Sequence, residues 1–98
     1  MRYEIHFYSD AIDDLRSLKA NARAKILDTI EKCLRYEPDR ESKSRIKRLR
    51  GFSSPQYRLR VDDYRVHYDI VTDTTVEIIS VVLKEQAVDW LEREGVKE

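Results

Sequence analysis

Residues 57–70 constrain the fold more than any other part of the chain, because polar and apolar side chains alternate there along two stretches joined by a very short turn. Such alternation is typical of half-buried β-strands, and the Asp62–Asp63 pair suits a two-residue hairpin turn. This turn fixes the pairing, and therefore the side chains that share a face. The face that other elements should cover carries Tyr57, Leu59, Val61, Tyr64, Val66 and Tyr68.

The opposite face of this hairpin gathers basic side chains. The expected pairing places Arg60 opposite Arg65 and Arg58 opposite His67. Like charges directly opposite one another destabilise a pair of strands, so stability alone does not explain this arrangement. Arginine is well suited to planar, bidentate recognition of phosphate. We therefore expect an anion-binding face; the alternative is that these arginines pair with carboxylates of the C-terminal helix or lie in water.

Patterns on either side of the hairpin predict an α+β fold in a single domain, residues 1–98. A half-buried strand is expected over residues 2–8, followed by two amphipathic helices. The apolar run 76–83 predicts a central strand covered on both faces, and residues 85–94 predict a closing helix with Gly95 at its C′ position. The expected order is β-α-α-β-β-β-α, a mainly antiparallel sheet with the helical hairpin packed on one face.

Polar residues and a proline mark the expected ends of the first two helices. Ser9 and Asp10 offer N-cap side chains, and Asp13–Asp14 would lie in the first turn, where the helix dipole favours negative charge. Asn21 is expected to cap the second helix, and Pro38 to stop it.

The charge is unevenly distributed although it sums to zero, with 19 basic and 19 acidic residues. Residues 35–68 hold ten basic and five acidic side chains, and residues 69–98 hold three and eight. The segments 39–50 and 51–55 are expected to be loops. Segregated charge focuses a field locally, which indicates nucleic acid as a partner; the alternative is a solvated basic loop balanced by an acidic tail. The stretch 43–60 lacks acidic residues and contains Lys43, Arg45, Lys47, Arg48, Arg50, Arg58 and Arg60.

The basic face also suggests a reaction. RNA carries its own nucleophile in the 2′-hydroxyl, so its cleavage requires orientation, charge stabilisation and, ideally, proton transfer. Ser80 should lie beside His67, with Lys84 further along the same face. The neighbouring arginines should lower the pKa of His67, which suits a base better than an acid. Lys84 would act as a base only if the same field lowered its pKa.

Other chemistries find little support. Cys33, His6 and His67 form no zinc pattern, and two glycines cannot build a phosphate-binding loop, so no metal or cofactor is expected. Cys33 falls on the apolar stripe of a helix and is expected in the core. No apolar run is long enough to span a membrane, and a lone cysteine fits the reducing cytoplasm, where we expect the protein to act.

Four short runs resemble the RelE/ParE superfamily of toxins from bacterial and archaeal toxin–antitoxin pairs. They are residues 48–51 (RLRG), 57–61 (YRLRV), 63–68 (DYRVHY) and 78–81 (IISV). The resemblance covers nearly the whole chain, and the expected elements fall in the family order. It does not separate the RelE branch, which cleaves mRNA on the ribosome, from the ParE branch, which inhibits gyrase.

The RelE resemblance implies roles for individual residues. Arg58 and Arg60 match positions that bind the substrate backbone and assist proton transfer. Arg65 matches a position that stabilises the transition state. Lys84 matches a residue that contacts the scissile phosphate. The implied products are a 2′,3′-cyclic phosphate and a 5′-hydroxyl. The implied partners are the ribosome, its mRNA and a small antitoxin, which covers this surface or displaces the C-terminal helix in a heteromeric complex.

The sequence departs from the RelE pattern where acid–base groups are common. Arg58 and Arg60 stand where lysine is usual, and arginine does not deprotonate. Trp90 stands near a position that often holds tyrosine or histidine; it can stack on an RNA base, but packing of the last helix on the sheet is the favoured interpretation. A gyrase inhibitor and a non-toxic antitoxin-binding protein therefore remain alternatives to the endoribonuclease.

Overall fold

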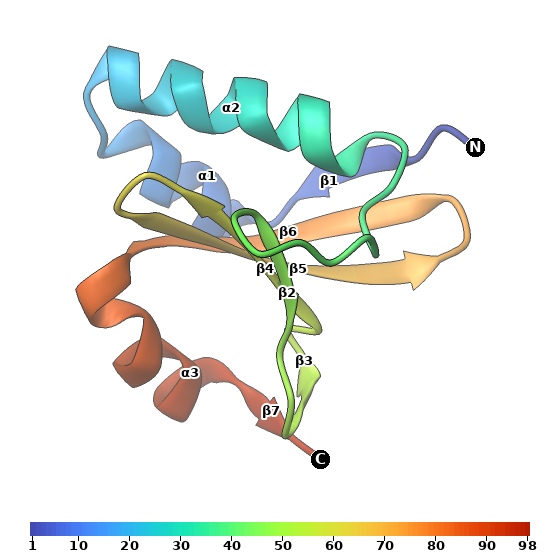
Figure 1. Ribbon diagram of the computed structural model, residues 1–98. Helices are drawn as coiled ribbons and strands as arrows, with labels where there is room; N and C mark the ends of the chain where they lie inside the picture. The colour runs from blue at the N-terminus through green and yellow to red at the C-terminus, as the bar shows by residue number, and fades with distance from the viewer.

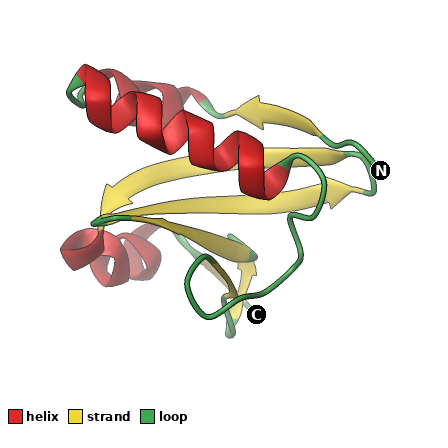
Figure 2. Cartoon of the chain, turned by 45° about the horizontal axis from the view of Figure 1, so that its top comes forward, coloured by secondary structure: helices red, strands yellow, loops and turns green.

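The computed structural model describes all 98 residues as an α+β fold built on one five-stranded sheet. The strand order is β1-β6-β5-β4-β2, and only β1 runs parallel to its neighbour. The helical hairpin lies on one side of this sheet and α3 on the other (Figures 1 and 2). The bounds are β1 Glu4–Phe7, α1 Ser9–Arg16, α2 Ala20–Leu34, β2 Ile46–Arg48, β3 Phe52–Ser54, β4 Tyr57–Val61, β5 Tyr64–Thr72, β6 Thr75–Leu83, a 3₁₀ turn Lys84–Gln86, α3 Ala87–Glu94 and β7 Val96–Lys97.

The core lies between the helical hairpin and the sheet, as the alternation of residues 57–70 predicts. Leu59, Val66 and Tyr68 are fully buried on this side, against Ile26 and Ile30 of α2. The buried Tyr68 hydroxyl donates a hydrogen bond to the Pro38 carbonyl over 2.6 Å, which ties the chain after α2 to the sheet. A buried polar group needs such a partner. The burial of Leu59, Val66 and Tyr68 confirms that the predicted helix-facing side is the packed side.

The predicted register of the β4–β5 hairpin is confirmed. Arg60 pairs with Arg65 and Arg58 with His67, across a turn in which Asp62 adopts a positive φ of 52°. On the other edge of β5, His67 pairs with Ser80, as expected.

Strand β6 contains a bulge that the sequence does not announce. Tyr68 pairs with Ile78 but His67 pairs with Ser80, so Ile79 is an extra residue. The bulge reverses the alternation: Ile78 faces the core, Ser80 faces the basic side, and Val81 faces the core again. This phase change contributes to the nearly continuous apolar run, and β6 is contacted by α1 on one face and by α3 on the other, as the run predicts.

Two regions expected to be loops contain short strands. β2, within residues 39–50, pairs with the free edge of β4, and Ile46 enters the core. β3, within residues 51–55, pairs with β7 at the C-terminus. The carboxylate of Asp69 accepts hydrogen bonds from the Ser54 hydroxyl and the Gln56 amide, both at 2.6 Å. Strands of two or three residues are too short to show a periodicity, so contacts of the whole fold determine them.

The expected caps of the helical hairpin are wrong. The N-cap residues are Tyr8 and Lys19, both in extended conformation and without a side-chain cap, so Ser9, Asp10 and Asn21 lie inside their helices. Asp13–Asp14 consequently falls beyond the first turn, and the Asp14 carboxylate accepts a hydrogen bond from the Val81 amide over 2.9 Å.

The closing helix differs at both ends from the expectation. It begins with a 3₁₀ turn, and Gly95 is its C-cap in extended conformation, with φ −70°, where a left-handed C′ residue was expected. Glycine is needed at position 95 because the backbone there passes close to the Phe52 ring, and a Cβ would lie 2.7 Å from that ring. No helix of the structure combines the length and apolar character needed to cross a membrane.

Candidate nucleic-acid interface

The sheet face turned away from the helical hairpin carries the predicted basic cluster. Arg58 and Arg60 come from β4, and Arg65 and His67 come from β5 beside them. β2 extends this face, because Lys47 pairs with Arg58. Alternation along three neighbouring strands thus gives the sheet one apolar and one cationic side.

No ion pair neutralises the cluster. The structure contains six ion pairs, and none involves Arg58, Arg60, Arg65 or Lys84. Arg65 instead donates from Nη1 to the backbone carbonyls of Asp62, at 3.0 Å, and Tyr64, at 2.9 Å. The alternative in which carboxylates of the C-terminal helix pair with these arginines is therefore wrong.

Helix α3 covers part of this face (Figure 1). A partly open cavity of about 320 Å³ lies between α3 and the sheet. The sheet side of the cavity is basic, and the α3 side is apolar. No carboxylate lines it, so a bound phosphate would meet four nitrogen-bearing side chains against an apolar wall. The lining residues are Leu49, Arg58, Arg65, His67, Lys84, Ala87, Val88 and Leu91.

Arg58 and Arg65 are held in a partly dehydrated, electropositive setting. Burial is the main cause that lowers the pKa of each guanidinium, and repulsion from neighbouring arginines lowers it further. Arginine stays charged at such shifts, so these partly buried guanidinium groups without an ionic partner favour the binding of an anion.

His67 lies in the cavity wall, but it is only 1% exposed. Its Nδ1 atom is 2.9 Å from the Ser80 hydroxyl, and the Trp90 ring stacks on the imidazole with centroids 4.7 Å apart. Burial, reinforced by Arg58 and Arg65, lowers the pKa of His67 to about 4. The predicted direction is confirmed, although burial outweighs the arginines that we had taken as the cause.

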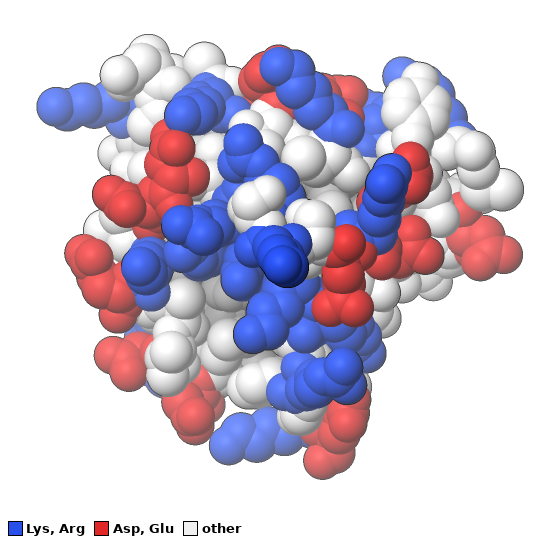
Figure 3. Space-filling view, viewed as in Figure 1, with Lys and Arg blue, Asp and Glu red and all other residues white.

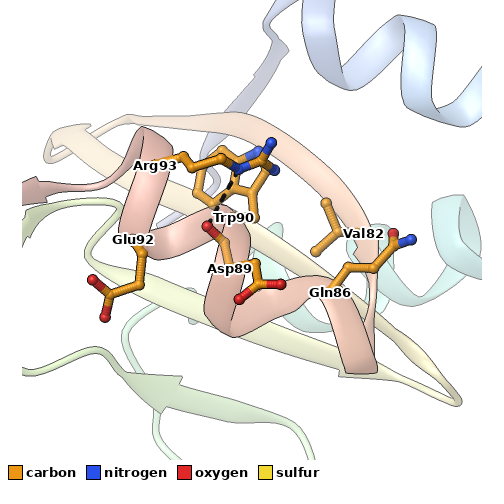
Figure 4. A pocket seen from close by; sticks show the side chains of 6 residues that line it. All are labelled: Val82, Gln86, Asp89, Trp90, Glu92 and Arg93. Carbon is orange, nitrogen blue, oxygen red and sulfur yellow. Dashed lines mark hydrogen bonds between the residues drawn. The ribbon is translucent and has the colours of Figure 1, made fainter.

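Trp90 packs α3 onto the sheet, which is the favoured interpretation of this residue. It also borders a second, larger hollow of about 610 Å³ between β6 and α3 (Figure 4). Asp89 and Glu92 line that hollow, so its charge suits a phosphate less well than the cavity on the other side of Trp90.

The basic stretch 43–60 does not act as one surface. Lys43 and Lys47 line an open hollow with Arg58, and Arg45 donates a hydrogen bond to the carbonyl of Arg60 over 3.0 Å. Figure 3 shows Lys and Arg side chains gathered in the middle of this view, over the region of β2 and β4 in Figure 1.

Two members of that stretch lie elsewhere. Arg48 is on the opposite side of the sheet, where its guanidinium stands 5.3 Å from the centre of the Tyr57 ring and donates to the Gln56 carbonyl over 2.7 Å. Arg50 lines a small hollow with Gly51 and Glu98, near the C-terminus. These two predicted RNA-binding residues are thus separated from the cavity.

Sequence reasoning missed the apolar half of the cavity. Ala87, Val88 and Leu91 form the apolar side of α3, and this side faces the arginines rather than the main core. The sequence showed the spacing of these residues, but it did not show that they pack over Arg58 and Arg65.

Comparison with known proteins agrees with this architecture. A sequence profile of the family described as the ParE toxin of the type II toxin–antitoxin system parDE matches residues 5–88. A toxin named RelE1 from Methanocaldococcus jannaschii is 29% identical over 86 residues, which cover 88% of this chain and 93% of that protein.

Solved structures give the same result. The toxin–antitoxin complex RelBE2 of Mycobacterium tuberculosis matches with a TM-score of 0.68 and 29% identity, over 85% of this chain and 99% of that one. A mutant of the E. coli toxin RelE in the free state matches with a TM-score of 0.66 and 25% identity, over 96% and 99%. The length of the profile match and the shared fold show that this chain belongs to the RelE/ParE superfamily and is a RelE-like toxin of a type II toxin–antitoxin system.

Proposed function

We propose that the protein is a ribosome-dependent mRNA endoribonuclease that inhibits translation without a metal ion. The observation that carries this proposal is the cavity under α3, where Arg58, Arg65 and Lys84 converge with no carboxylate among the lining residues. A phosphodiester placed there is surrounded by cations in a partly dehydrated space, where electrostatic stabilisation is strongest.

In the proposed reaction, the 2′-oxygen of the RNA attacks the adjacent phosphorus and the bond to the 5′-oxygen breaks. The 2′-hydroxyl loses its proton and the departing 5′-oxygen gains one, which gives a 2′,3′-cyclic phosphate and a 5′-hydroxyl. Arg65 stabilises the charge on the five-coordinate phosphorus, while Arg58 and Lys84 hold the phosphate oxygens. Arg60, which is exposed beside Arg65, binds the flanking backbone.

His67 is the candidate base, since its low pKa keeps the imidazole neutral at physiological pH. Trp90 stacks on it, so we propose that α3 moves away from the sheet before the 2′-hydroxyl reaches the imidazole. We propose that catalysis rests mainly on positioning and charge stabilisation, with His67 contributing when α3 is displaced.

The proposed partners are the ribosome with its mRNA and a cognate antitoxin, in the cytoplasm. The similarity to the toxin–antitoxin complex of Mycobacterium tuberculosis supports the antitoxin. Lys43, Arg45 and Lys47, which lie outside the cavity, would contact RNA beside it.

The test is Arg65→Ala, with induced expression and mapping of mRNA 5′ ends. We expect growth arrest and mRNA cuts to disappear while antitoxin binding stays largely unchanged, because Arg65 makes only backbone hydrogen bonds within the fold. Full toxicity of this variant would overturn the proposal, and cuts that persist without translation would argue against ribosomal action.

The burial of His67 favours one alternative, a gyrase inhibitor without catalytic activity. That protein would need no acid or base in the cavity. Induced expression would then raise DNA-damage signals and leave mRNA intact, which the same experiment distinguishes.

A further inference from the structure

We propose that the open hollow beside β2 is a second phosphate subsite, which binds the phosphodiester next to the one held under α3. The hollow has a volume of about 530 Å³ and is lined by Glu41, Ser42, Lys43, Ile46, Lys47 and Arg58. This inference rests on the proposed function, because it assigns the hollow to the same RNA strand.

Arg58 connects the two sites, since it lines both the hollow and the cavity. Lys47 pairs with Arg58, and Arg58 pairs with His67, so the three side chains form a row across β2, β4 and β5. Paired strands lie about 4.8 Å apart, so this row spans about 10 Å, with Arg58 at its middle. A strand crossing the sheet along this row would place both phosphates against one guanidinium.

The polar groups of the hollow are arranged for an anion. Lys43 and Lys47 take part in no ion pair. The single carboxylate, on Glu41, accepts a hydrogen bond from the Arg48 amide over 2.9 Å. The Ser42 oxygen accepts from the amides of Arg45 and Ile46, at 3.1 and 3.3 Å, which leaves its proton free to donate to a phosphate oxygen.

The openness of the hollow fits a flanking nucleotide. Lys43 and Lys47 are exposed, whereas Arg65 and His67 are buried. The hollow therefore adds affinity and directs the strand, and the cavity under α3 holds the phosphate that reacts.

The test compares ligands with one and two phosphodiesters. All-deoxy dinucleotides and trinucleotides, which cannot be cleaved through a 2′-hydroxyl, are titrated against the isolated toxin by NMR. We expect Lys43→Ala/Lys47→Ala to weaken trinucleotide binding about fivefold and to leave dinucleotide binding unchanged. The salt dependence of trinucleotide binding should fall by about 0.7 in log–log slope, as for one phosphate of a single strand.

The matched control is Lys19→Ala/Lys32→Ala, which removes the same charge from the helical hairpin. An equal loss for both ligands, or an equal loss in the control, would overturn the subsite. Because this binding assay needs no cleavage, its failure is distinct from a failure of the Arg65→Ala test. If the trinucleotide binds as expected but Arg65→Ala stays toxic, the phosphate subsite is supported and the nuclease proposal is rejected.

Discussion

The two sides of the sheet differ in burial and in charge. On the helical hairpin side, Leu59, Val66 and Tyr68 have no exposed surface, and an apolar core closes around them. On the α3 side, the helix has no fully buried residue, and it stands over arginines that have no ionic partner. One side supplies the free energy that folds the chain, so the other can carry a charge arrangement that costs stability.

The largest expected effect is on the hairpin side. Leu59→Ala removes a fully buried side chain and should lower the free energy of unfolding by about 2–5 kcal/mol, measured by urea denaturation. Arg58, the neighbouring residue in β4, is the control. Arg58→Ala should change that free energy by under about 1 kcal/mol, and a loss as large as that of Leu59→Ala would contradict the comparison.

The next effect concerns His67, a titratable group that is only 1% exposed on the α3 side. Its pKa is about 4 in the fold and about 6.5 in the unfolded chain, so the unfolded state binds a proton first as pH falls. Stability from this group is complete above pH 6.5 and is lost as pH falls towards 4, by about 3 kcal/mol at most.

His67→Gln should flatten this part of the pH profile of urea denaturation, because glutamine does not titrate. His6→Gln is the control, since His6 is exposed on β1. An unchanged slope between pH 4 and 6.5 in His67→Gln would show that other groups cause the loss.

The smallest effect should have the opposite sign. Arg60 lies directly opposite Arg65, and cross-strand like charges are destabilising. Arg60→Thr should therefore raise the free energy of unfolding by about 0.5 kcal/mol while it weakens RNA binding. Equal or lower stability of Arg60→Thr would mean that the exposed guanidinium is already screened by water.

The sequence was sufficient for the features that local chemistry determines. The two-residue turn set the register of β4 and β5. Ser80 lies beside His67, as a short turn between Thr72 and Thr75 predicts, because the extra residue Val71 in β5 and the bulge at Ile79 in β6 offset each other. The amphipathic spacing of α2 indicated correctly that Ile26, Ile30 and Leu34 are buried, but it also included Leu27, which is 38% exposed. The roles proposed for Arg58, Arg60, Arg65, Lys84 and the other basic residues stay predictions.

The features that were missed depend on distant contacts. Strand β2 forms because β4 offers an unpaired edge, and β3 forms because β7 returns to it. The sequence indicated that α3 packs on the sheet through Trp90, but it did not show that the side carrying Ala87, Val88 and Leu91 faces the arginines. The true helix caps were missed since backbone conformation at Tyr8 and Lys19 replaced the side-chain caps.

The bulge at Ile79 divides β6 into two halves whose side chains alternate in opposite phase. Before it, Val76 and Ile78 pack under the helices, and after it Ser80 faces His67. A bulge also bends its strand and increases the twist, so it changes the direction of the second half of β6, which leads into Lys84. A single extra residue thus places core-packing side chains and a cavity-side hydroxyl on one continuous strand.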